Sequence, residues 1–217
     1  SSDQEVAFQA VDYILRVLKK NMVFGMTWGR AMHEFVEQLA KDERLRSLSF
    51  QNVKVVPFLG TPGAIQSDSW NTTTYSNTLA TKVGNLLHCA SYNLSAPMYV
   101  EGTKEKELIE SIDEIAKVLH MAETADIALI GIGSMQDDSS IIKAEIRTKE
   151  EYKELVRKGA VGEIVGRIYD KNGQTVDEDL KRKMVGISLD KIAKIPVRVG
   201  MSYGKDKIEA IKGAIAG

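Results

Sequence analysis

Glycine, threonine and arginine lie together in the segment "MVFGMTWGRAMHEF", where an apolar run changes directly into a helical pattern. When a strand leads straight into a helix, the first amide N–H groups of the helix lack partners, and the positive end of its dipole favours an anion. Glycine lets the backbone come close to such an anion. The segment therefore predicts a site for a small anion, and we expect the phosphate of a sugar phosphate. The residues concerned are Gly25, Thr27, Trp28, Gly29 and Arg30.

Glycines also follow or end other apolar runs of the chain. They are Gly60 and Gly63, Gly131 and Gly133, and Gly200 and Gly204. In an open α/β sheet, ligands bind outside the carboxyl ends of the strands, so these loops are expected to meet at one edge. A single loop is weak evidence, because glycine often only makes a tight turn. The convergence of several loops is the informative feature.

Two charged side chains are candidates for contacting the ligand. Lys207 stands at the start of the last predicted helix, where a lysine opposes the helix dipole unless an anion compensates. The alternative is an ordinary solvated lysine. Glu163, in "GAVGEIVG", could accept hydrogen bonds from sugar hydroxyls, or it could cap a helix or lie in an exposed loop. Trp28 either stacks on a ligand or packs its own loop.

The composition excludes several other classes of protein. The net charge is -1 and like charges do not form blocks, so the chain lacks the clustered basic residues expected of a domain that binds DNA by itself. The single cysteine, Cys89, excludes an internal disulfide and a structural zinc site, and the three histidines lack metal-ligand spacing. No apolar run is long enough to span a bilayer, and "GIGS" lacks the third glycine of a dinucleotide fingerprint. We therefore expect no metal, no cofactor and no membrane partner, and a cytoplasmic location.

Apolar runs and amphipathic stretches alternate along the 217 residues and predict the elements that would position these side chains. Strands are predicted at residues 22–24, 53–59, 94–100 and 126–134, and at the start of the closing segment "IPVRVGMSYGKDKIEAIKGAIAG". Helices are predicted at residues 4–20, 30–40, 77–87, 103–121 and 149–158, and at the end of the chain. In "IVGRIYDKNGQTV", Asn172–Gly173 predicts the turn of a hairpin. The alternation indicates an α/β fold, with a mostly parallel sheet flanked by helices and an antiparallel hairpin insertion.

A family resemblance covers nearly the whole chain. It is carried, in this order, by "FGMTWGRA", "VVPFLGTPG", "LSAPMYVEG", "ADIALIGIGS", "KGAVGEIVGRIYDKNG", "VGISLDKIAKIP" and "GMSYGKDKIEAIKGAI". Together these segments resemble the effector-binding domain of SorC/DeoR-type bacterial transcriptional regulators. The most specific pieces are "GAVGEI…YDKNG" and the closing pattern of Gly204, Lys207, Ala210 and Ile211.

The resemblance implies a Rossmann-like fold similar to that of sugar-phosphate isomerases and aminosugar-phosphate deaminases. Such domains bind a phosphorylated sugar and change how an amino-terminal helix-turn-helix domain holds DNA, usually as homodimers or homotetramers. By this resemblance, Lys207 and the loop from Gly25 to Arg30 would hold the phosphate. The loop that starts at Gly60 would border the sugar with Tyr75 and Asn77, and Glu163 matches an acidic position that contacts hydroxyls.

Three departures from the family pattern bear on the ligand. Ala31 stands where many members have threonine, so one expected hydroxyl is missing. Leu59 stands where some members have a lysine that bonds their sugar, so covalent capture is not expected. "GTPG" replaces the usual paired glycines and could reshape sugar specificity.

We expect residues 1–217 to be a single effector-binding domain that lacks its DNA-binding domain and is truncated at its carboxyl end, where a parallel fold would want another strand. The function expected is ligand sensing, not catalysis. The alternative is a sugar-phosphate isomerase or aminosugar-phosphate deaminase, which would need a positioned general base. Glu163 could serve, but no acid–base pair stands out. A nicotinamide-dependent oxidoreductase is disfavoured by the glycine pattern.

Overall fold

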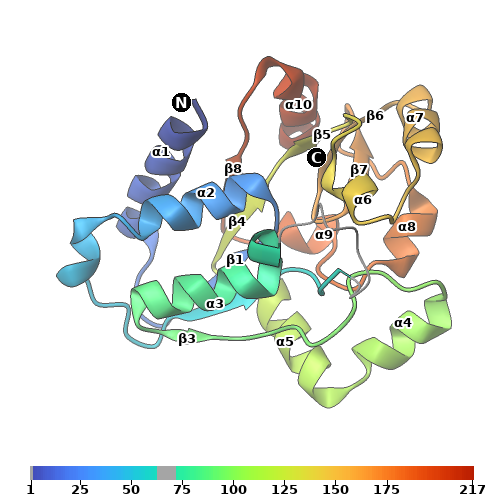
Figure 1. Cartoon of the computed structure of the whole chain (residues 1–217). Coiled ribbons are helices and arrows are strands. Elements are labelled where there is room, and N and C mark those ends of the chain that lie inside the picture. The colour runs from blue at the N-terminus through green and yellow to red at the C-terminus, as the bar shows by residue number, and fades with distance from the viewer. Residues whose placement is uncertain (1, 63–71) are drawn as a thin grey trace.

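The computed structural model of the chain describes residues 2–62 and 72–217. It contains one parallel and one antiparallel sheet, with helices around both (Figure 1). The helices are α1 (Ser2–Val17), α2 (Arg30–Leu39), α3 (Ser76–Leu87), α4 (Thr103–Glu110), α5 (Asp113–Glu123), α6 (Ser140–Lys143), α7 (Lys149–Arg157), α8 (Glu178–Lys183), α9 (Leu189–Ile192) and α10 (Ile208–Ala216). Short 3₁₀ helices are η1 (Glu43–Arg46), η2 (Thr72–Thr74) and η3 (Lys205–Lys207).

The parallel sheet has the strand order β3-β2-β1-β4-β8. Its strands are β1 (Val23–Met26), β2 (Lys54–Pro57), β3 (Ala90–Ser91), β4 (Ile127–Gly131) and β8 (Val197–Met201). Every neighbouring pair in it is parallel. Parallel strands need crossover connections, and helices supply them here. The predicted α/β architecture is therefore confirmed.

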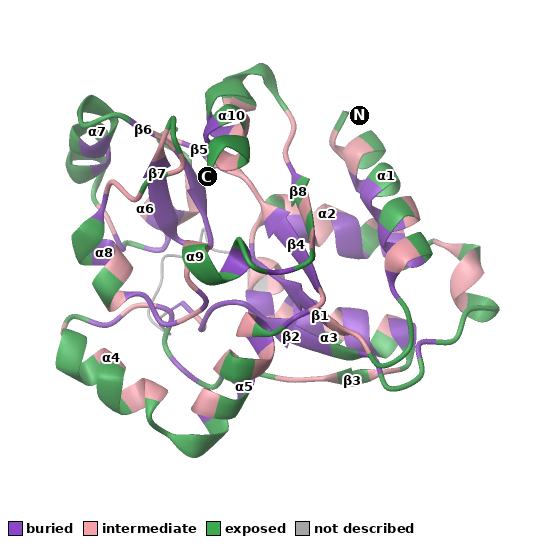
Figure 2. Cartoon of the chain, turned by 180° about the vertical axis from the view of Figure 1, so that it is seen from behind, coloured by how far each residue is buried: buried purple, intermediate pink, exposed green. Residues whose placement is uncertain are grey.

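Most residues of the inner strands of this sheet are buried (Figure 2), and their side chains pack on both faces. On one face, Phe24 and Leu129 pack among buried residues of α1, α2 and α3. On the other face, Phe58 and Ile130 join a second core with residues of α5, α9 and the antiparallel sheet. Because both faces are covered, the short strands consist mainly of apolar residues.

The antiparallel sheet has the order β5-β6-β7 and consists of β5 (Gly133–Ser134), β6 (Ala160–Ile164) and β7 (Arg167–Asp170). Only Ile132 separates β4 from β5. The apolar run at residues 126–134 was predicted as one strand, but it passes from the parallel sheet into the antiparallel one. The two sheets are therefore joined by a direct continuation of the chain.

The predicted hairpin turn at Asn172–Gly173 is present, since Tyr169 and Thr175 form an antiparallel bridge across it and the Val176 N–H donates to Ile168 O at 2.9 Å. The same segment also contains a turn that the sequence did not predict. The chain turns between β6 and β7 at Val165 and Gly166, whose φ angles are 54° and 69°. Positive φ at both central residues is the geometry of a type I′ turn, which a β-branched residue rarely adopts. The predicted Asn172–Gly173 pair forms a further turn, in which the Gly173 N–H donates to Asp170 O at 2.9 Å.

The third strand was predicted at residues 94–100, and this prediction was wrong. The strand beside β2 is β3, and residues 94–100 form only isolated bridges, from Pro97 to Thr61 and from Tyr99 to Met184. Pro97 has no N–H for a regular ladder. The segment instead ties the loop after β2 to the loop after α8.

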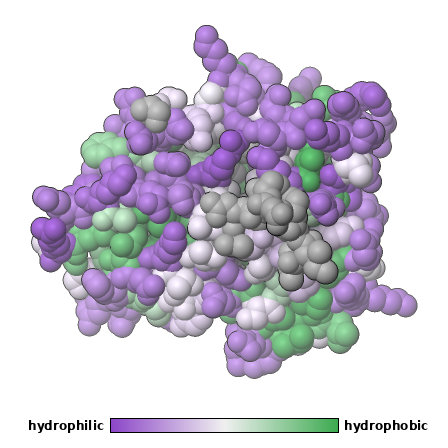
Figure 3. All heavy atoms as spheres, in the orientation of Figure 1, coloured by the Kyte–Doolittle hydropathy of each residue, from purple (hydrophilic) through white to green (hydrophobic). Residues whose placement is uncertain are grey.

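The helix predicted at residues 103–121 is two helices, because the chain turns extended at Ile112 (φ -64°, ψ 123°). The Ser111 hydroxyl donates to Leu108 O at 2.7 Å, a local bond that competes with helix continuation. The break leaves Leu108 and Ile112, predicted to lie on the buried stripe, 69% and 51% exposed. They belong to the hydrophobic surface over α4 and α5 (Figure 3). Within the described residues, no helix has the length and apolar character needed to cross a membrane.

Candidate functional site

A cleft lies at the carboxyl ends of β1, β4 and β8, between the parallel sheet and β6 of the antiparallel sheet. It gathers residues from four separate stretches of the chain. Of the residues predicted to bind ligand, it is lined by Trp28, Gly29, Arg30, Gly131, Gly133, Glu163 and Lys207. The first glycine loop and Lys207 therefore border the same cavity, as the anion hypothesis requires.

The first wall of the cleft is the start of α2, at Gly29 to Ala31. Gly29 has φ 105°, a conformation that favours glycine, and its N–H donates to Thr74 O at 3.0 Å. Among the described residues, no side chain caps α2 at Gly29, and the first turn of the helix holds no acidic residue. Arg30 lies beside it, with its Nη2 2.9 Å from Asp138 Oδ2. A helix start of this kind, with a cation next to it, is suited to an anion.

Lys207 forms the opposite wall together with Ser134. The Lys207 ammonium donates to Ser134 Oγ at 2.9 Å and lies 3.5 Å from Asp206 Oδ2. The Ser134 hydroxyl in turn donates to the same Asp206 carboxylate at 2.9 Å. The Lys207 side chain is 21% exposed, so its charge borders the cleft without being fully solvated.

Glu163 lies on β6 in the interior of the cleft, with 7% of its surface exposed. Its carboxylate accepts hydrogen bonds from the Gly166 N–H and the Trp28 indole. Burial raises the pKa of Glu163 to about 7, against the opposing effects of those two hydrogen bonds and the Lys207 charge. A Cβ on Gly133 would lie 2.9 Å from Glu163 Oε2, so Gly133 leaves the room that this carboxylate occupies.

The raised pKa of Glu163 makes a testable contribution to stability. Since the folded-state pKa (about 7) exceeds the ordinary glutamate value of 4.5, the folded protein holds this proton more tightly than the unfolded chain. Stability from this group is therefore full below pH 4.5 and is lost as the pH rises through 7. Between pH 5 and pH 8, we expect the unfolding free energy of the wild type to fall, relative to Glu163→Gln, by on the order of 2 kcal/mol. Denaturation at several pH values measures this difference, and a constant difference would contradict the assignment.

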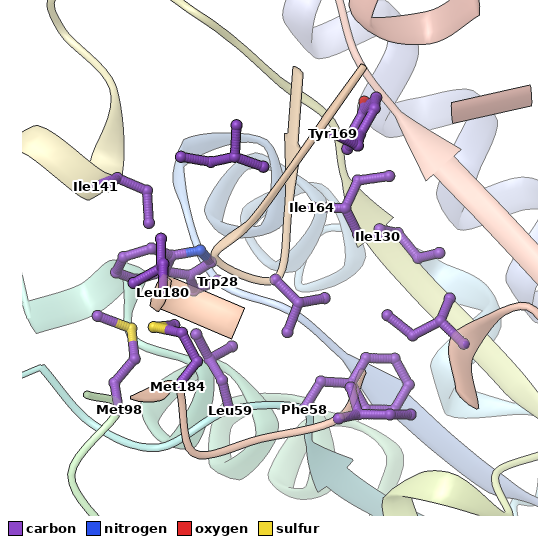
Figure 4. Close-up of a cluster of buried hydrophobic side chains, with 14 of the residues drawn as sticks. Trp28, Phe58, Leu59, Met98, Ile130, Ile141, Ile164, Tyr169, Leu180 and Met184 are labelled. Carbon is purple, nitrogen blue, oxygen red and sulfur yellow. The ribbon is translucent and has the colours of Figure 1, made fainter. Parts of the chain in front are cut away.

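Of the two roles considered for Trp28, the structure supports the packing of its own loop. Its ring is 5% exposed and packs among Leu59, Ile141, Leu180 and Met184 (Figure 4). Its indole N–H reaches Glu163, and the residue also lines the cleft. Trp28 therefore anchors the first loop in the core and holds the carboxylate in place.

Thr27 lies beneath the cleft and is buried. Its hydroxyl oxygen accepts a hydrogen bond from the Gly131 N–H at 3.0 Å and so joins the loops after β1 and β4. Thr27→Val would leave that N–H without its partner, and we expect a loss of about 1–2 kcal/mol of unfolding free energy. Thr27→Ser keeps the hydroxyl and should lose less. Urea denaturation of both variants tests this, and equal losses would show that the hydrogen bond is unimportant.

Other predicted residues lie away from the cleft. Gly25 is inside β1, and Gly60 packs against the backbone of residues 96 and 97, where a Cβ would meet Ala96 O at 2.5 Å. The Asn77 side-chain amide makes hydrogen bonds of 2.8 to 3.0 Å to the Thr61 hydroxyl and to the backbone of Leu94. Tyr75 precedes α3 and does not line the cleft. Gly63 lies outside the described residues.

Several residues that line the cleft were not predicted. They are Ser134, Asp138, Ser139, Ser140, Ser202 and Tyr203. Ser134 and Ser202 follow β4 and β8, as the predicted glycines do, so their position after a strand was the signal that could have identified them. Ser139 caps α6 and accepts a hydrogen bond from the Ile142 N–H.

A parallel α/β fold with a polar cleft at the carboxyl edge of its sheet defines a ligand-binding domain of the Rossmann-like type. A family model described as "Putative sugar-binding domain" matches residues 1–217. The chain belongs to this family, which confirms the resemblance drawn from its motifs.

Curated relatives are named as transcriptional regulators. The sorbitol operon regulator of Klebsiella pneumoniae is 28% identical over 204 residues, which cover 93% of this chain and 61% of the regulator. The transcriptional regulator LsrR of Enterobacter sp. (strain 638) is 26% identical over 212 residues, covering 96% of this chain and 60% of its own length. The chain thus spans about three fifths of the length of these relatives.

Solved structures show the same fold. The full-length sorbitol operon regulator SorC of Klebsiella pneumoniae matches 100% of this chain with a TM-score of 0.86 and 24% identity, over 68% of its own length. A DeoR family transcriptional regulator from Listeria monocytogenes matches 99% of this chain with a TM-score of 0.80 and 24% identity, over 78% of its own length.

Proposed function

We propose that this domain senses a phosphorylated sugar and is part of a transcriptional regulator. The phosphate lies between the start of α2 and Lys207, and Glu163 accepts hydrogen bonds from hydroxyls of the sugar. Occupancy of the cleft changes how the subunits of a cytoplasmic homodimer or homotetramer are arranged. That arrangement controls DNA binding by another part of the regulator. Allostery of this kind requires that the ligand bind two arrangements with different affinity.

The observation that supports the proposal most is the shared cleft of the α2 start and Lys207. An uncapped helix start supplies amide N–H groups, and Lys207 supplies a positive charge on the opposite wall. These are the groups that phosphate binding uses. The buried carboxylate of Glu163 between them provides an acceptor that a neutral hydroxyl can satisfy. The family membership and the regulator names of the relatives support the choice of a sugar ligand and of a regulatory role.

Catalysis is the alternative, because the pKa of Glu163, about 7, would suit a general base. The proposal is that the domain binds its ligand without turnover. Incubation with aldose, ketose and aminosugar phosphates, followed by product analysis, separates the two functions. Steady isomerisation or deamination would replace the sensor proposal by an enzymatic one.

Ligand screening by thermal shift tests the sensor function directly, since a ligand that binds the native state raises its melting temperature. The screen compares pentose and hexose phosphates with the matching unphosphorylated sugars and with inorganic phosphate. We expect one class of sugar phosphates to raise the melting temperature more than its sugar or phosphate does alone. Equal shifts for phosphorylated and unphosphorylated sugars would contradict the phosphate assignment.

A further inference from the structure

The carboxylate of Asp206 already contacts the two groups on the Lys207 side of the cleft. It accepts the Ser134 hydroxyl at 2.9 Å, and its Oδ2 lies 3.5 Å from the Lys207 ammonium. The pKa of Asp206 is lowered, first by the Ser134 hydrogen bond and further by the Lys207 charge, so the side chain is ionised at neutral pH. In the unliganded domain, the Lys207 charge and the Ser134 hydroxyl therefore already have an anionic partner from the chain itself.

The backbone holds Asp206 in this place. Gly204 has φ 105° and precedes η3, and a Cβ on it would lie only 2.5 Å from Asp206 Oδ1. The carboxylate thus packs over a glycine that leaves room for it. The neighbouring η3 lysine, Lys205, does not line the cleft, so the competition concerns Lys207.

We propose that Asp206 is an internal competitor for the anionic group of the ligand and thereby sets the selectivity of the cleft. This inference rests on the proposed binding of a phosphorylated sugar. An anion that approaches Lys207 must either displace the Asp206 carboxylate or bind beside its negative charge. The tethered carboxylate is always present at a high effective concentration, whereas free phosphate is dilute.

The consequence is discrimination between free phosphate and phosphorylated sugars. Inorganic phosphate can gain the amide contacts at the start of α2 and the contact with Lys207, and Asp206 opposes the second of these. A phosphorylated sugar also gains the hydroxyl contacts of Glu163, which Asp206 does not touch. The competitor therefore weakens both ligands but leaves only the sugar ester with enough remaining contacts to bind.

The test is isothermal titration of the whole chain with inorganic phosphate. Asp206→Asn keeps the size of the side chain and an acceptor for Ser134 but removes the charge. We expect it to bind phosphate at least about fivefold more tightly than the wild type, which corresponds to an ion pair of ordinary strength. Unchanged or weaker binding would overturn the inference and make Asp206 a residue that positions Lys207.

Two further variants make the result specific. Glu209→Gln removes the same charge from the same helical region, on a side chain that pairs with Lys212 outside the cleft, and should not alter phosphate binding. An equal gain of phosphate affinity in Glu209→Gln would show that the effect comes from the net charge alone, and would overturn the inference. In a Lys207→Ala background, Asp206→Asn should give no gain in phosphate affinity, because the ammonium group for which Asp206 and phosphate compete is absent. A gain that persists there would also refute the competition.

Titration with glucose 6-phosphate, ribose 5-phosphate and the best ester from the thermal-shift screen separates this inference from the proposed function. If Asp206→Asn gains phosphate affinity but no sugar ester binds either protein, the competitor exists and the sensor function fails. If a sugar ester binds through Lys207 and Asp206→Asn changes nothing, the sensor function holds and the competitor is refuted.

Discussion

Replacing Lys207 by alanine is expected to weaken binding of a phosphorylated sugar by about ten- to a hundredfold while the protein stays folded. The ammonium group is the cation on its wall of the cleft and would donate a charged hydrogen bond to the phosphate. Loss of such a bond costs about 1.5–3 kcal/mol, which gives the expected factor. Isothermal titration with the sugar phosphate found by thermal shift measures it.

The chain offers a matched control for this change. Lys205 lies two residues earlier in η3, is exposed and does not line the cleft. Lys205→Ala removes the same charge and should leave the affinity close to that of the wild type. If both variants lose affinity equally, Lys207 acts only through the overall charge and has no special role. Binding of an unphosphorylated sugar should be insensitive to either change.

The largest effect on stability is expected from Gly25→Ala. A Cβ at this position would lie 2.0 Å from Phe58 Cε1, and Phe58 is fully buried in the core below the cleft. Because the ring has no room to move, the sheet or the ring must shift, and we expect a loss of about 3 kcal/mol of unfolding free energy, at the upper end of overpacking. Chemical denaturation, followed by circular dichroism, measures this loss.

A second substitution tests the cause. Phe58→Leu removes ring atoms that the new methyl would meet, so the double variant should be more stable than the sum of the two single losses predicts. Strict additivity would show that the loss caused by Gly25→Ala does not arise from the contact with Phe58. The result therefore tests the packing role that the structure gives to Gly25.

The sequence predicted four strands of the parallel sheet, β1, β2, β4 and β8, because each belongs to a mainly apolar run beside a glycine loop. It missed β3, which has only two residues. It also predicted the two opposite walls of the cleft. Trp28 to Arg30 and Lys207 each stand where a strand has ended and a helix begins, and such positions must meet at one edge of a parallel sheet.

From the sequence, a glycine that lets a ligand come close to the backbone cannot be distinguished from a glycine that leaves room for another part of the chain. Gly25 makes room for Phe58 and Gly60 for the backbone near Ala96, and both contacts join distant parts of the chain. Sequence patterns also missed the turn at Val165, because a β-branched residue is a poor candidate for positive φ. There, the Glu163 carboxylate accepts the Gly166 N–H and stabilises the turn.

The pairing of Ser134 with Asp206 was missed for a similar reason. The two residues are 72 positions apart, and no sequence pattern links the segments to which they belong. Only the antiparallel sheet, which places β5 beside β6 and near α10, brings them together.

The walls of the cleft belong to different sheets, and Ile132 alone lies between β4 and β5. A ligand that reaches Gly29 on one side and Glu163 on the other would bridge the two sheets, so its length, as well as its chemistry, decides whether it can contact both.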